Sequence, residues 1–123
     1  MWNAVLGVFL IIHGFIHWIY IAPNPNTPGA PLWSFLTQRW FVVKAGFDNT
    51  TAMILGITLI SLVTIGFLVS GIGLLTGQDW WRIAAIVSSG VSMLLLVLFW
   101  HNWMIAGPIL NIVIIILALY WGR

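Results

Sequence analysis

The most constraining feature of this sequence is its shortage of charge: four Lys or Arg and two Asp or Glu among 123 residues, of which 62% are hydrophobic. Soluble domains carry roughly 25% charged residues, whereas this chain carries 5%. So few charges cannot keep such an apolar surface in water, so lipid must be the solvent for most of it. The sequence therefore predicts an integral membrane protein.

The apolar residues fall into four runs, each near the ~20 residues that cross a bilayer core. We expect membrane-spanning helices at about residues 2–22, 52–76, 80–100 and 103–121. Only Gly77-Gln78-Asp79 joins the second run to the third, which predicts antiparallel neighbours. The expected fold class is all-α: an integral membrane four-helix bundle that forms one transmembrane domain over residues 1–123.

The connection between the first two runs, about residues 23–49, has two parts. It begins with a proline-rich stretch, Pro23 to Pro31, that cannot continue a helix. From Leu32 to Lys44 the apolar residues recur at helical spacing among polar ones. This pattern predicts a short amphipathic helix at the membrane interface.

Aromatic residues mark the ends of the four runs, as expected of the two interfaces of a bilayer. One belt contains Trp2, Trp80, Trp81, Tyr120 and Trp121, and the other contains Trp18, Tyr20, Trp33, Trp40, Trp100 and Trp103. The basic residues divide evenly between the two faces, and the uncharged first hairpin favours its own export. We therefore expect a multi-pass protein of a prokaryotic-type cell membrane, with both termini in the cytoplasm.

Three histidines are expected in one leaflet: His13 and His17, one helical turn apart, and His101 at the end of the third run. Such imidazoles ligate a metal or haem, relay protons, hydrogen-bond a quinone, or pack as neutral helix contacts. Asn111 lies near the middle of the fourth run, at a depth that allows a contact with His13. The candidate ligand-binding residues are His13, His17, Tyr20, Trp100, His101 and Asn111, and the three histidines are the candidate metal ligands.

Catalytic patterns are missing from the sequence. It contains no Cys and no Glu, and neither a nucleophile elbow, a phosphate-binding loop nor a zinc-protease motif. Thiolate chemistry is therefore excluded and hydrolysis is not expected, and the dispersed cations argue against a nucleic-acid surface. The serines of the second and third runs are expected to serve close helix packing, and Asp79 with Arg82 to form a helix cap and a local ion pair.

The second half of the chain resembles the DoxX-like group of small four-helix membrane proteins. The resemblance covers the second run through the fourth: a second run ending in FLVSGIGLLTG, a tight turn with Arg82, and a third run ending in LLLVLFWHN. An aromatic-His element of that group falls on Phe99, Trp100 and His101. The resemblance implies an accessory subunit of a membrane redox complex near a quinone, as in thiosulfate-quinone oxidoreductases.

The favoured hypothesis is a non-catalytic accessory subunit of a larger redox or photosynthetic membrane complex. It would pack against other membrane subunits or against itself, in contact with the lipid bilayer, and hold a quinone, pigment or lipid near its histidines. Two alternatives stay open from the sequence: a b-type haem or metal-binding electron carrier, and a small dimeric transporter.

Overall fold

The computed structural model describes residues 1–23, 26–32, 34–37 and 40–122, and all regular structure in these ranges is helical, as predicted. The longer helices are α1 (Trp2–Ile16), α4 (Asn49–Leu75), α5 (Trp81–Leu98) and α6 (Ala106–Tyr120). The shorter ones are the 3₁₀ helices η1 (His17–Ile21) and η2 (Asn102–Met104) and the helices α2 (Ser34–Thr37) and α3 (Trp40–Ala45).

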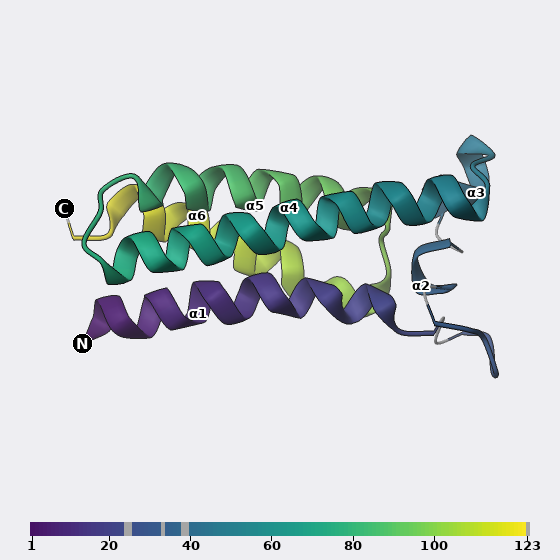
Figure 1. Cartoon of the computed structure of the whole chain (residues 1–123), viewed down its shortest axis with the longest axis horizontal. Coiled ribbons are helices and arrows are strands. Elements are labelled where there is room, and N and C mark those ends of the chain that lie inside the picture. The colour runs from purple at the N-terminus through teal and green to yellow at the C-terminus, as the bar shows by residue number, and fades with distance from the viewer. Residues whose placement is uncertain (24–25, 33, 38–39, 123) are drawn as a thin grey trace.

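The four longer helices lie side by side and alternate in direction, so both termini lie at one end of the molecule (Figure 1). Each packs mainly on its neighbour in the chain: α1 on α4, α4 on α5, and α5 on α6. The contact between α1 and α6 is much smaller, so the space between these two helices is the least filled side of the molecule.

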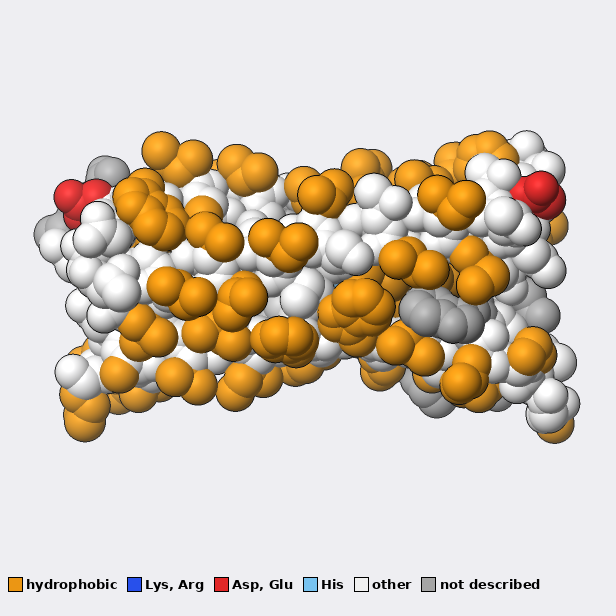
Figure 2. Space-filling model, in the orientation of Figure 1, with side chains coloured by type: hydrophobic (Ala, Val, Ile, Leu, Met, Phe, Trp, Pro, Cys, Tyr) orange, Lys and Arg blue, Asp and Glu red, His pale blue; other side chains and the backbone are white. Residues whose placement is uncertain are grey.

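Three segments in the described part of the chain are long and apolar enough to cross a membrane: Trp2–Ile21, α4 and α5. The longest, α4, has 27 residues, or about 40 Å at about 1.5 Å per residue. In Figure 2 hydrophobic side chains cover the visible face between the two ends, and acidic side chains appear only at those ends. These features are those of a membrane protein.

Two helix boundaries differ from the predicted runs. The second helix begins at Asn49, before the apolar run, because the Asp48 carboxylate accepts a hydrogen bond from the Thr51 backbone N–H at 2.8 Å and caps it. The last helix has only 15 residues, since η2 precedes it and α6 starts at Ala106. Pro108 lies in its first turn, where the missing backbone N–H leaves no helical bond unmade.

Glycines set the separation of α1 and α4. A Cβ built on Gly71 would lie 2.6 Å from the Gly7 carbonyl oxygen, and one built on Gly14 would lie 2.9 Å from the Phe67 Cβ. The Thr64 hydroxyl donates across this contact to the Gly14 carbonyl at 3.1 Å. Small residues and a hydroxyl bond at a close crossing are typical of helices that pack in a membrane.

The segment predicted as one interfacial helix is described in part, as α2 and α3, while residues 33 and 38–39 lie outside the described residues. Leu36 is fully buried against Gly56 of α4. The Trp40 indole donates to the Val97 carbonyl at 2.8 Å. Both short helices therefore pack on one end of the longer helices, as Figure 1 shows for α2 and α3.

Two of the aromatic residues near the ends of the apolar runs are buried between helices, Trp81 at 4% exposure and Tyr20 at 1%. The expected Asp79 cap is wrong, because α5 starts after Trp80 without a side-chain cap. Arg82 donates to the carbonyls of Ala118 at 2.9 Å and Trp121 at 2.6 Å. Both carbonyls lie at the C-terminal end of α6, where helical donors are missing, and the guanidinium supplies the donors.

We expect Arg82→Met to loosen the last turn of α6. Two carbonyls lose a charged donor, which lowers the local opening free energy by about 1–2 kcal/mol. Hydrogen exchange of the amides at the end of α6 should become faster, while exchange at its start stays unchanged. Gln78→Met, in the exposed turn before α5, is the matched control, and equal exchange in both variants would contradict the role of Arg82.

Candidate functional site

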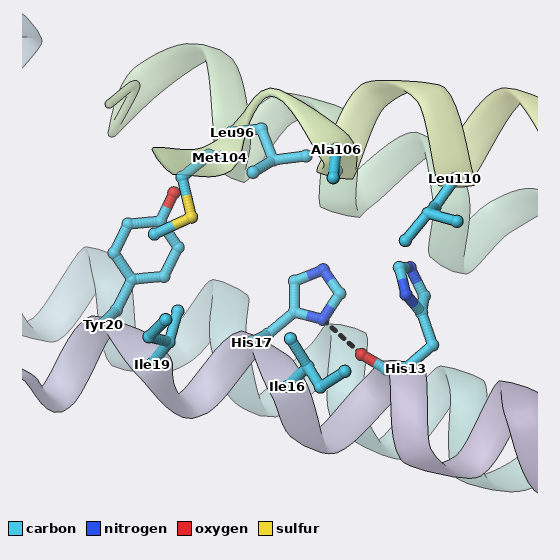
Figure 3. Close-up of a pocket in the computed structure, with 10 residues that line it drawn as sticks. His13, Ile16, His17, Ile19, Tyr20, Leu96, Met104, Ala106 and Leu110 are labelled. Carbon is cyan, nitrogen blue, oxygen red and sulfur yellow. Dashed lines mark hydrogen bonds between the residues drawn. The ribbon is translucent and has the colours of Figure 1, made fainter. Parts of the chain in front are cut away.

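A cavity of about 130 Å³ lies where α1 and α6 fail to pack against each other. Figure 3 shows His17 and His13 extending from the first helical segment towards Ala106 and Leu110 of α6, while Tyr20 lies beside Met104. Most of the lining is aliphatic, and the polar side chains among the described lining residues are those of His13, His17 and Tyr20. Ile16 and Ile19 line the cavity and are exposed, so it opens onto the outer surface of the helices.

A buried hydrogen-bond network lies next to this cavity: His13 and His17 belong both to the network and to the lining, whereas Ser92 and Asn111 lie behind them, fully buried. His13 Nε2 lies 3.1 Å from Asn111 Oδ1, and Asn111 Nδ2 donates to Ser92 Oγ at 2.8 Å. Ser92 Oγ is also 2.6 Å from His17 Nε2. The second ring nitrogen of His17, Nδ1, lies 2.9 Å from the His13 carbonyl oxygen. The network is a closed loop that joins α1, α5 and α6.

The spacing of the two histidines explains how they share the network. Residues four apart on a helix lie on the same face, so both rings point away from lipid, and His13 and His17 are 3% and 6% exposed. Phe67 of α4 packs against both rings, with centroids 4.8 Å from His13 and 6.0 Å from His17. One atom is left over: within the described chain, His13 Nδ1 is buried without a hydrogen-bond partner.

The structure brings together four of the six predicted ligand-binding residues. His13, His17 and Asn111 belong to the network, and Tyr20 lines the same cavity while its hydroxyl donates to the Phe99 carbonyl at 3.1 Å.

The other two predicted residues lie elsewhere. Trp100 packs against the hydrophobic cluster around Phe99. His101 follows α5, is partly buried, and accepts a backbone hydrogen bond from Met104 through its carbonyl. Neither residue belongs to the described lining of the cavity.

Sequence reasoning missed Ser92, which is fully buried at the centre of the network. The sequence predicts only a packing role for it, because α5 carries several serines close together. Its depth in the membrane could have indicated a contact with His17. Ser92 lies about two turns before the end of α5, and His17 lies at a similar depth near the end of α1.

The donor set does not fit a metal ion or a haem. Three of the four imidazole nitrogens of His13 and His17 are already hydrogen-bonded, and the two nitrogens of His17 face a carbonyl and a serine. The described residues contain no group of three or more His, Cys, Asp or Glu side chains placed to hold a metal. The cavity is also smaller than the ~300–1,000 Å³ of ordinary cofactor pockets.

Comparison of the chain with models of protein families, with curated proteins and with solved structures finds no match. The resemblance to DoxX-like proteins stays a prediction, and function has to be argued from the site.

Proposed function

We propose that this chain is a small multi-pass membrane subunit that holds the ring of a lipid-soluble ligand, such as a quinone or quinol, between α1 and α6. The observation that carries the proposal is a buried polar network at the wall of an otherwise apolar cavity that opens onto the lipid-facing surface. Ligand sites typically combine an apolar lining with a few placed polar groups.

The size of the cavity favours a single six-membered ring. An engineered protein cavity of about 150 Å³ binds benzene, and this one is about 130 Å³. A ring seated there would contact Leu96, Met104 and Leu110, while an attached isoprenoid or acyl tail would leave past Ile16 and Ile19. A large pigment macrocycle is a poorer fit to this volume.

The topology proposed is four membrane crossings, with α6 and η2 together making the fourth. Both termini lie at one end of the molecule, which agrees with an even number of crossings and with both termini in the cytoplasm. All four longer helices expose Ile, Leu or Val side chains. Such surfaces suit lipid and neighbouring membrane subunits equally, and the absence of a catalytic arrangement at the site favours an accessory role.

We expect the purified protein to bind decylbenzoquinol in mild detergent, measured by quenching of tryptophan fluorescence, and to release quinones or quinols into organic extracts. Ala106→Phe fills the mouth of the cavity and should weaken binding at least tenfold. Ile109→Phe places the same ring on the exposed side of α6, outside the described lining, and should leave binding unchanged. Equal binding by both variants would rule out this cavity as the site.

A further inference from the structure

A second cavity, of about 220 Å³, lies at the end of the molecule that holds both termini. Its described lining comes from the start of α1, the end of α4, the turn into α5, the start of α5 and the residues after α6, and none of it belongs to the cavity between α1 and α6. Trp2, Trp80 and Tyr120 are exposed at the same end. Such aromatic side chains are typical of a membrane interface, so this cavity lies at the level of lipid headgroups.

The Arg82 guanidinium is a fixed donor group in the lining of this end cavity. It donates to the Ala118 and Trp121 carbonyls, and its central carbon lies 5.2 Å from the centroid of the Trp81 ring. A guanidinium carries five N–H groups, so these two bonds leave donors to spare. Nη2 lies 4.0 Å from a Cβ built on Gly122, which also lines the cavity. The positive charge is therefore held at the cavity wall.

Three further polar side chains line the end cavity: Asn3, Gln78 and Asp79. Asn3 Oδ1 accepts from the Trp121 indole at 2.7 Å, and its NH₂ group is left as a donor. Gln78 Nε2 donates to the Thr76 carbonyl at 3.4 Å, and its amide oxygen is left as an acceptor. The exposed Asp79 carboxylate makes no hydrogen bond or ion pair within the described chain. Donors thus come from α1 and α5, and acceptors from the turn between α4 and α5.

The two charges of the end cavity do not neutralise each other directly. Arg82 and Asp79 are three residues apart, but the guanidinium is directed to the end of α6 instead of the carboxylate. A simple anion would be attracted by one group and repelled by the other, and so would a simple cation. A molecule that carries both charges, with acceptors on its anionic part and N–H donors on its cationic part, satisfies both groups at once.

We propose that the end cavity binds a phosphate joined by a short linker to a primary ammonium, as in the headgroup of phosphatidylethanolamine. The phosphate oxygens accept from Arg82 and Asn3, and the ammonium donates to Asp79 and the Gln78 amide oxygen. The volume of about 220 Å³ exceeds the ~150 Å³ of a cavity that holds benzene, so such a group has room. Exposed apolar side chains of α1 and α6 continue from this end into the membrane and offer a surface for acyl chains.

The first test compares three dioleoyl lipids: phosphatidylethanolamine, phosphatidylcholine and phosphatidylglycerol. Each is added to the delipidated protein in mild detergent, and bound lipid is counted by native mass spectrometry. We expect phosphatidylethanolamine to bind about fivefold more tightly than either of the others, a modest factor because the charges are partly exposed. The choline ammonium has no N–H to donate, and phosphatidylglycerol has no ammonium. Equal binding of the three lipids would overturn the proposal.

The same zwitterion could come from a lipid or from a soluble molecule, and a competition experiment distinguishes the two sources. Glycerophosphoethanolamine carries the headgroup without acyl chains. Little or no displacement of bound phosphatidylethanolamine by a hundredfold excess identifies a lipid ligand, which is held by its chains as well as by its headgroup. Displacement at equal concentration identifies a soluble phosphoethanolamine compound as the ligand.

A pair of matched variants tests the role of the carboxylate. Asp79→Asn removes the acceptor charge from an exposed side chain, so the preference for phosphatidylethanolamine over phosphatidylcholine should fall below twofold. Asp48→Asn removes the same charge at the opposite end and keeps the cap of α4, because an asparagine oxygen also accepts from the helix N–H groups. This control should keep the preference. Decylbenzoquinol binding should not change in either variant, since neither residue is in the described lining of the cavity between α1 and α6. An unchanged lipid preference in Asp79→Asn would overturn the assignment of the ammonium to Asp79, and with it the proposal.

Discussion

Gly71→Leu is expected to be strongly destabilising, costing about 3 kcal/mol or more. A Cβ at this position would lie 2.6 Å from the Gly7 carbonyl oxygen and 2.6 Å from Ile11 Cγ1. The first of these atoms is backbone, so no side-chain rotation relieves the clash, and α1 has to move away from α4. Loss of folded protein with increasing sodium dodecyl sulfate in mixed micelles measures the effect.

Gly90→Leu is the matched control for this prediction. Gly90 lies on α5 and is exposed, and a Cβ built there would point into open space. Leucine there should leave stability within about 0.5 kcal/mol of the unmodified protein or improve it slightly, since glycine is a poor helix former. If both variants unfold at the same detergent fraction, the close crossing of α1 and α4 does not contribute to stability.

The helical class and the approximate positions of the helices follow from composition and run length, because lipid requires every backbone polar group to be bonded within its own segment. Their ends do not follow in the same way. The start of α4 depends on the carboxylate of Asp48, and the end of α6 on a guanidinium from another helix. Hydropathy does not detect either contact, since both are made by single side chains outside or between the apolar runs.

Trp81 shows where residue type misleads. A tryptophan next to a turn is typical of a membrane interface, and Trp80 beside it is 46% exposed, as an interfacial residue would be. Trp81, one residue on, faces inward and packs in the cluster that contains Leu74 and Ala118. Sequence position gives the depth of a side chain in the membrane but leaves its direction around the helix to be settled by packing.

The candidate site was predictable in part for the same reason. His13 and His17 are one turn apart on one helix, so their common face follows from helix geometry alone. Depth also allowed the contact between His13 and Asn111, which the structure has at 3.1 Å. His101 shares the depth but lies after the end of α5, where the chain turns, so depth could not bring it into the network. Ser92 needed the rotation of α5, which only the packed structure supplies.

Asn111→Leu is expected to cost about 1–3 kcal/mol, because it leaves two buried groups without partners at once. The His13 Nε2–H loses its acceptor and Ser92 Oγ loses a donor. Leucine has the branching pattern of asparagine but is larger, so overpacking at this fully buried position adds to the cost. Unfolding in mixed micelles and the melting temperature in mild detergent both report the loss.

A double substitution separates the hydrogen bonds from the packing. In the double variant His13→Leu with Asn111→Leu both ends of the contact are apolar, so no Nε2–H is left without an acceptor. The remaining loss is the hydrogen bond that Asn111 donated to Ser92 Oγ. The double variant should therefore be more stable than the sum of the two single effects predicts, by about 1 kcal/mol. Strict additivity would mean that the 3.1 Å contact between His13 and Asn111 contributes no coupling. The polar loop would then provide no energetic link between α1 and α6.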